Sequence, residues 1–326
     1  MDKKDNLLDQ ILTLKESILA IENLNNHNWP EFNLEKFKTI NEFKKEVFYK
    51  IVNEFKFTPN ILQVVKCNEF NLKFFRVREL STIKNIDVFS EHSYPPPYFT
   101  KMGRCNFPEN PVFYCSNDPG TSLFEVIRDG NYKKKQFCIS KWEIIPSEEI
   151  FIFENYLRNE LPNKNPFKDL NDNLVERLDE TFEGKLTKEK REGVFKYLEF
   201  IDNSFINDNN YSLSASIAHD SLFREHETRA DVLMYPSRQS NLVGLNLAIN
   251  PNFVNNNMKI SRFYTVEINN ISEKRDKYNI SFINYGKVIN RLTYWRKIMQ
   301  QDEEFEKFVQ EDFGQSFYEN IDSNKK

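Results

Sequence analysis

The residues best suited to chemistry lie in the stretch GRCNFPENPVFYCSNDPGTSLFEVIRDG, residues 103 to 130. Three of the chain's eight glycines occur there, and a glycine often marks a turn or a close approach that a side chain would obstruct. Arg104 can hold phosphate, Tyr114 can stack on a flat heterocycle, and Glu125 can stabilise a developing cationic sugar. Together with Arg76 and Ser237, this set suits an anionic dinucleotide or a nucleotide-sugar.

The same stretch predicts a strand, a turn and a helix. PVFYCS, residues 111 to 116, is a short apolar run between turn formers, which is typical of a buried strand. Residues 117 and 118 offer a helix N-cap, and Pro119 suits the first helical position. Gly130 is placed to end the helix, and Glu125 lies off its apolar face. That face is expected to contain Leu123, Val126 and Ile127.

Motifs of several common enzyme classes are missing. The sequence has no GxGxxG, GxxxxGK[ST], GxSxG or HExxH pattern. His219 and His226 lie among acidic residues, but their spacing fits no standard ligand pattern, so we expect a charged helix end and no metal. The cysteines have no CxxC spacing and are expected to be reduced, partly buried thiols: Cys67, Cys105, Cys115 and Cys138.

Composition restricts the range of partners. The chain has 326 residues and a net charge of −4, so it can bury a large core but has no general basic excess for nucleic acid or anionic membranes. No apolar run approaches the roughly 20 residues that span a bilayer, and MDKKDNLLDQ has no signal-peptide core. We therefore expect a soluble, cytoplasmic protein that binds neither membrane nor nucleic acid directly.

The segments around these residues predict an α+β chain. Amphipathic patterns predict helices over 5 to 24 and 33 to 57, inside an N-terminal helical unit of residues 1 to 70. A mixed sheet core is expected over 71 to 290, with a helical insertion at about 147 to 210. Residues 291 to 326 are expected to form a helical tail. Further expected elements are strands at 74 to 78, 135 to 145, 231 to 237 and 245 to 253, two strands within 260 to 290, a loop at 94 to 111 and a helix at 211 to 223.

Four blocks of the sequence, taken in order, resemble the RES domain, which is named for its Arg, Glu and Ser. They are FRVR at 75 to 78, GRCN at 103 to 106, VFYCSNDPGTSLFE at 112 to 125 and YPSRQSNLVGLNLAINP at 235 to 251. The resemblance covers about residues 70 to 270. It implies an ADP-ribosyltransferase-like fold and a toxin that destroys NAD+ by cleaving the bond between nicotinamide and ribose.

The resemblance also implies roles for particular residues. Catalytic roles fall to Arg76, Glu125, Ser237 and Tyr114, and substrate-binding roles to Arg104, Asn106, Arg238 and Asn246. On this basis Glu125 would stabilise positive charge on the ribose, the arginines would hold phosphate, and Tyr114 would stack on nicotinamide. One position departs from the family: Cys105 stands where a bulky aromatic residue is usual, and Phe107 is expected to supply a ring nearby.

The implied reaction is phosphorolysis, with NAD+ as substrate, inorganic phosphate as co-substrate and no other cofactor. A toxin also requires restraint, so a cognate antitoxin or regulatory protein, or inhibition by residues 1 to 70, is expected. Homo-oligomerisation is left open. Two alternatives also remain at this point: an ADP-ribosyltransferase that modifies a protein or nucleotide acceptor, and an inactive NAD-binding module whose N-terminal helices recruit a partner.

Overall fold

A computed structural model describes residues 7–59, 61–128, 130–165, 167–275, 277–314 and 319–320. It has a mixed α+β architecture in which a large sheet is combined with helices. The helices are α1 Leu14–Asn25, α2 Ile40–Phe55, α3 Pro119–Val126, α4 Lys168–Phe182, α5 Lys188–Asn207, α6 Ser212–Phe223, α7 Pro251–Asn257 and α8 Glu303–Asp312. Short 3-10 turns are η1 Leu7–Gln10, η2 Leu80–Thr82, η3 Phe89–His92, η4 Pro97–Phe99 and η5 Arg238–Ser240.

The sheet of the described residues has eleven strands in the order β1-β5-β6-β7-β3-β2-β4-β8-β9-β10, with β11 beside β9. Its pairs are antiparallel except β5–β6 and β9–β11. The strands are β1 Gln63–Lys66, β2 Phe74–Glu79, β3 Phe113–Ser116, β4 Gln136–Ile144, β5 Ile150–Asn155, β6 Val232–Pro236, β7 Leu245–Ile249, β8 Met258–Ile271, β9 Lys277–Ile289, β10 Leu292–Lys297 and β11 Glu319–Asn320. Because β6, β7, β3 and β2 are consecutive neighbours, residues far apart in the sequence meet on them.

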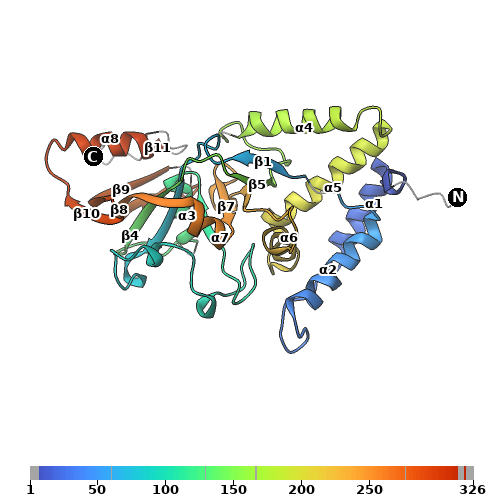
Figure 1. Cartoon of the computed structure of the whole chain (residues 1–326), viewed down its shortest axis with the longest axis horizontal. Helices are drawn as coiled ribbons and strands as arrows, with labels where there is room; N and C mark the ends of the chain where they lie inside the picture. Colours follow the sequence, from blue (N-terminus) through green and yellow to red (C-terminus); the bar gives the residue numbers. More distant parts are fainter. Residues whose placement is uncertain are drawn as a thin grey trace.

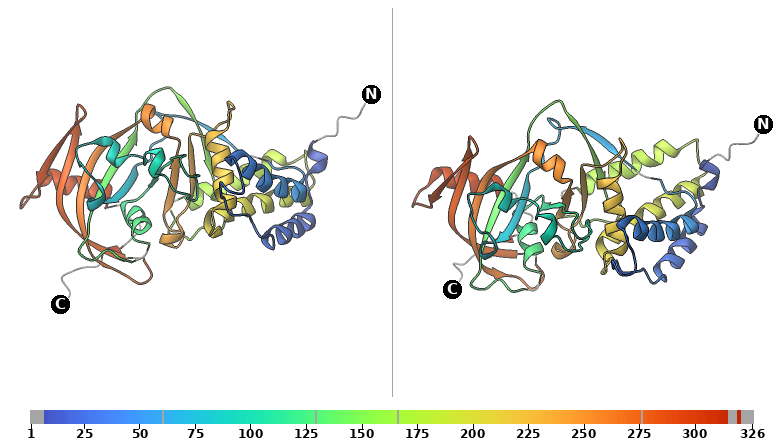
Figure 2. Two further views of the ribbon diagram at one scale, coloured as in Figure 1. Left: turned by 90° about the horizontal axis from the view of Figure 1, so that it is seen from below. Right: turned by 60° about the horizontal axis from the view of Figure 1, so that its bottom comes forward.

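The N-terminal helices and the strands β8 to β10 lie at opposite ends of the molecule. Figure 1 shows α1 and α2 at one end, with α5 running beside them and α6 nearer the middle, and β8, β9 and β10 at the other end together with α8. Both views in Figure 2 show the same separation of the N-terminal helices from these strands. The expected strands at 74 to 78, 111 to 116 and 135 to 145 are confirmed as β2, β3 and β4. The expected helix at 211 to 223 is confirmed as α6.

The N-terminal helices are shorter than predicted. The structure places η1 at the start of the segment predicted as one helix over 5 to 24, and α1 begins only at residue 14. The cause is Thr13, which forms a capping box with Glu16 and so starts a new helix. Likewise, Thr39 caps α2, so the helix predicted from residue 33 begins at residue 40. The first 70 residues also contribute β1, which pairs with β5.

The expected helical insertion at about 147 to 210 contains a strand as well as helices. β5 crosses it at Ile150–Asn155 and pairs with both β1 and β6. Phe151 and Phe153 of this strand are buried and Ile152 between them is half-buried, a pattern that the charged neighbours obscured. The tail expected to be helical over 291 to 326 contains the helix α8 but opens with a strand, β10, which lies at the edge of the sheet and pairs with β9. Residues 315–318 and 321–326 of that tail lie outside the described part of the chain.

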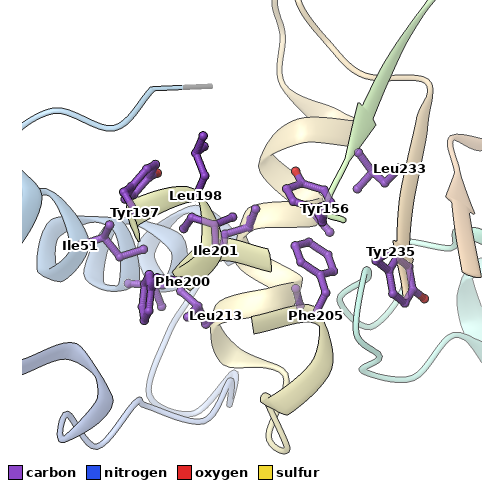
Figure 3. Close-up of a cluster of buried hydrophobic side chains, with 14 of the residues drawn as sticks. Ile51, Tyr156, Tyr197, Leu198, Phe200, Ile201, Phe205, Leu213, Leu233 and Tyr235 are labelled. Atoms are coloured by element: carbon purple, nitrogen blue, oxygen red, sulfur yellow. The ribbon is translucent and has the colours of Figure 1, made fainter. Parts of the chain in front are cut away.

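One buried hydrophobic cluster joins the N-terminal helices to the rest of the protein. Figure 3 shows Ile51 of α2 lying against Tyr197 and Phe200 of α5. Farther along α5, the Phe205 ring lies 4.2 Å from the ring of Tyr156 and 5.5 Å from that of Tyr235, measured between centroids. Tyr235 belongs to β6, so packing continues from α2 through α5 to the centre of the sheet.

Candidate functional site

Helix α3 presents Glu125 to a cavity at the centre of the sheet. The side chain of Asp118 caps the helix by accepting a hydrogen bond from Thr121 N, and Pro119 takes the first helical position, as predicted. The apolar face is formed by Leu123, Phe124 and Ile127, which are all buried. The expectation for Val126 is wrong, because this residue is 40% exposed and lies on the cavity side.

Three side chains donate hydrogen bonds to the Glu125 carboxylate. Oε1 accepts from Ser237 Oγ at 2.7 Å and from Asn246 Nδ2 at 2.7 Å. Oε2 accepts from Arg128 Nη2 at 2.6 Å. Ser237 follows β6 and Asn246 lies on β7, while Glu125 and Arg128 belong to the α3 segment. Charge-assisted bonds of this kind fix the position of a carboxylate.

Arg76 on β2 brings a half-buried positive charge to the same cavity. Its Nη1 donates to the Tyr114 carbonyl oxygen at 2.6 Å, and its Nε is buried without a hydrogen-bond partner. Within the described residues no carboxylate lies within 4.0 Å of this guanidinium, whose carbon lies 5.4 Å from the centre of the Phe113 ring. Burial lowers the pKa of Arg76 to about 10, so it remains charged at neutral pH. A half-buried cation without a carboxylate partner is a suitable anion-binding group.

The turn at residues 103–106 is locked around the Tyr114 hydroxyl. Tyr114 Oη donates to Asn106 Oδ1 at 2.8 Å and accepts from the backbone N–H of Cys105 at 2.7 Å. Asn106 Nδ2 in turn donates to the carbonyl oxygens of Lys101 and Phe107 at 2.7 and 2.9 Å. A Cβ at Gly103 would lie 2.5 Å from Asn106 Oδ1, so only glycine fits this position.

Cys105, the departure from the family pattern, is fully buried in this turn. Burial raises the pKa of its thiol to about 12, so it remains protonated and inert at neutral pH. The ring expected from Phe107 is present, and it packs with Phe32, Phe43 and His219 rather than toward the cavity, with centroid separations of 5.0, 5.7 and 5.3 Å. Cys105 and Phe107 belong to the same buried hydrophobic cluster.

The cavity has a volume of about 400 Å³ and a strongly basic wall. Four basic residues line it, and Glu125 is its one acidic lining residue within the described chain. The basic set consists of Arg76, Lys101, Arg104 and Arg128. Arg104 lies over the Tyr211 ring at 5.4 Å and donates to the Ser204 carbonyl oxygen at 3.4 Å. This excess of positive charge, in a chain of net charge −4, is suited to an anionic ligand.

Seven of the eight predicted site residues converge on this region. Arg76, Arg104, Asn106, Tyr114, Glu125 and Asn246 line the cavity, and Ser237 reaches it through its bond to Glu125. Arg238 does not join them. Its side chain is exposed and donates to Asn209 Oδ1 at 3.1 Å, away from the cavity wall.

Two residues missed by the sequence analysis belong to the same arrangement. Arg128 lies three residues after Glu125 on the same helical segment, a spacing that predicts side-chain contact. Arg275, in the turn between β8 and β9, donates to Gln239 Oε1 at 2.6 Å and to the Arg128 carbonyl oxygen at 3.0 Å. It thereby ties the end of α3 to the turn that carries Ser237. No local pattern signals this contact, because it joins segments almost 150 residues apart.

The described residues contain no group of three or more His, Cys, Asp or Glu side chains that could hold a metal ion. Within the same residues, no helix combines the length and apolar character that crossing a membrane requires. In comparisons with known proteins, a family model described as RES domain matches residues 73–264, more than half of the chain. Searches of curated proteins and of solved structures gave no match.

Proposed function

The chain belongs to the RES domain family, which is linked in general to NAD-related enzymes, and from this premise we propose that it is an NAD+-degrading enzyme. It cleaves the bond between nicotinamide and ribose and transfers ADP-ribose to inorganic phosphate. An ADP-ribosyltransferase-like fold is part of this proposal. We also propose that the enzyme acts as a toxin in the cytoplasm and that a partner protein restrains it as an antitoxin.

The observation that carries the proposal is the carboxylate of Glu125 at the wall of an otherwise basic cavity. Its Oε1 is held at 2.7 Å by both Ser237 and Asn246, which come from different strands. Arg76 and Arg104 line the same cavity, and within the described residues neither forms an ion pair with a carboxylate. One fixed negative charge among several positive ones suits a substrate that carries a cationic centre next to phosphates, as NAD+ does.

In the first part of the reaction, the bond between the ribose C1′ and the nicotinamide nitrogen breaks. The nitrogen takes the bonding electrons and leaves as neutral nicotinamide, so positive charge develops on the ribose ring. Glu125 accepts a hydrogen bond from a ribose hydroxyl and stabilises this charge. Removing a preorganised group of this kind commonly costs about 10²- to 10³-fold in kcat.

In the second part, an oxygen of inorganic phosphate forms the new bond to C1′. The products are nicotinamide and ADP-ribose phosphorylated at that carbon, and the proton of the phosphate is released to solvent or remains on the new ester. Arg76 and Arg104 neutralise the pyrophosphate and the incoming phosphate. Tyr114 contributes its ring to the cavity wall while its hydroxyl is held by Asn106 and Cys105.

Product analysis tests this proposal. The purified full-length chain is incubated with NAD+ and inorganic phosphate, and the products are identified by mass spectrometry and ³¹P NMR. Equal amounts of nicotinamide and phosphorylated ADP-ribose are expected, and their formation should require phosphate. Formation of free ADP-ribose, or of label on added protein or nucleotide, would refute phosphorolysis. Binding of NAD+ without turnover would refute the enzymatic proposal.

A further inference from the structure

A second, larger groove adjoins the Glu125 cavity. It has a volume of about 1320 Å³ and lies between the segment of η3 with the prolines that follow and the edge formed by α7 and β8. Three residues line both hollows: Arg76, Pro95 and Phe99. The two spaces therefore meet at the half-buried side chain of Arg76 and at the aromatic ring of Phe99.

Phe99 is an exposed aromatic residue on a rigid support. It is 67% exposed and follows three consecutive prolines, which fix the backbone at residues 95–97. Thr100, directly after it, is buried, and its Oγ1 donates to the Pro96 carbonyl oxygen at 3.1 Å. A ring held this way loses little conformational entropy on binding, so it is a suitable stacking surface for a planar base.

The sizes of the two hollows indicate how they are used. The Glu125 cavity, at about 400 Å³, is near the lower end of the roughly 300–1,000 Å³ that is usual for small-ligand sites. A dinucleotide consists of two nucleosides joined by a pyrophosphate, so a ligand whose nicotinamide riboside fills this cavity must extend beyond it. Because Arg76 lines both hollows, the pyrophosphate can lie at their junction, and the second nucleoside then passes Phe99.

The charge of the groove agrees with an anionic ligand. Besides Arg76, four basic residues line it against two acidic ones, Glu91 and Glu143. The four are Arg78, Lys84, Lys259 and Arg291. Arg78 is engaged by the carbonyl oxygens of Glu91 and Thr82, whereas Lys84, Lys259 and Arg291 are exposed.

We propose that this groove is the binding site for the adenylate half of the dinucleotide substrate and that Phe99 stacks on its adenine base. The inference rests on the proposed function, since it concerns the other half of NAD+. Phe99 would act as a specificity determinant: it favours a dinucleotide over nicotinamide mononucleotide, which has the same scissile bond but no adenylate half.

The test compares the two substrates on the full-length protein. Stacking of a base on an aromatic side chain commonly contributes about 1–3 kcal/mol, which corresponds to about 5- to 150-fold in affinity. Phe99→Ala should lower kcat/KM for NAD+ by that factor and lower kcat/KM for nicotinamide mononucleotide by much less, because Phe99 lines the Glu125 cavity as well as the groove. Phe99→Trp should retain the NAD+ value. Tyr49→Ala is the control, because Tyr49 is an aromatic residue of α2 that is 71% exposed and lines neither hollow. Tyr98 is unsuitable, since its ring packs edge to face against the Phe99 ring at 5.3 Å between centroids.

Binding of AMP provides a second measurement that does not depend on turnover. Calorimetry should detect AMP binding to the wild-type chain and to Tyr49→Ala, and the affinity for AMP should fall by the same 5- to 150-fold in Phe99→Ala. The proposal would be overturned if Phe99→Ala lowered kcat/KM for NAD+ and for nicotinamide mononucleotide equally. It would also be overturned if Phe99→Ala changed neither NAD+ turnover nor AMP binding. Absence of NAD+ turnover by the wild-type chain would instead contradict the proposed function. The AMP measurement would still show whether the groove binds an adenylate.

Discussion

Replacing Ser237 with alanine isolates a single contact to the Glu125 carboxylate. Ser237 is fully buried, and its Oγ donates to Glu125 Oε1 at 2.7 Å. A hydrogen bond to a charged group contributes about 1.5–3 kcal/mol, which corresponds to about 10- to 150-fold in rate if the bond positions Glu125 in the transition state. The carboxylate retains Asn246 and Arg128 as donors, so we expect Ser237→Ala to fold and to lose activity mainly in kcat.

The assay follows nicotinamide release from NAD+ at saturating phosphate, with thermal unfolding measured in parallel. Ser214→Ala is the matched control, because Ser214 is also fully buried and its Oγ donates to Asp208 Oδ2 at 2.9 Å, away from the cavity. Both variants lose one bond from a serine to a carboxylate, so any difference in kcat reports on Glu125. An unchanged kcat in Ser237→Ala, or an equal loss in the control, would refute the argument that this bond positions the carboxylate.

Two further predictions concern residues around the site. Arg275→Ala removes hydrogen bonds to Gln239 Oε1 and to the Arg128 carbonyl oxygen, so kcat should fall by about tenfold with little change in KM for NAD+. Arg275→Lys should restore part of kcat. A rise in KM alone would contradict a positioning role for Arg275. Burial lowers the pKa of His219 to about 4 from the usual 6.5, so the unfolded chain binds more protons in this window and the protein should lose stability as pH falls from about 6.5 to 4. In His219→Phe this part of the slope of the unfolding free energy against pH should disappear, and an unaltered slope would show that other groups cause it.

The strand–turn–helix that carries Glu125 was predictable from the sequence because its signals are local. Asp118 and Pro119 begin α3, and a short apolar run forms β3, as expected. The exception within this unit is Val126, since periodicity alone does not show how far the apolar face of so short a helix extends. Its exposure follows from the cavity next to it.

The missed strands were those whose pairing partners lie far away in the sequence. β5 is surrounded by charged segments, and its place in the sheet comes from pairing with β1 and β6. β10 lies on an edge with mostly exposed or half-buried side chains, so its sequence carries little hydrophobic contrast. By contrast, the helix boundaries at Thr13 and Thr39 carried capping signals that a closer local analysis could have found.

Some of the site residues could be identified from the sequence and others could not. The resemblance to the RES domain brought together Arg76, Glu125 and Asn246, which line the same cavity. It also included Arg238, which the η5 turn directs toward Asn209 and solvent. The resemblance could not identify Arg275, because that residue follows the matched segment and acts through contacts to carbonyl and amide oxygens that are distant in the sequence.

The most direct test of the central claim is the rate of nicotinamide release from NAD+ by the wild-type chain and by Glu125→Gln. Glutamine keeps the size of the side chain and removes the charge, so the rate should fall by about 10²- to 10³-fold while the unfolding temperature stays close to that of the wild type. Glu176→Gln, which neutralises an exposed glutamate of α4, should release nicotinamide at the wild-type rate. Full activity in Glu125→Gln would contradict the assignment of this carboxylate as the group that stabilises the cationic ribose.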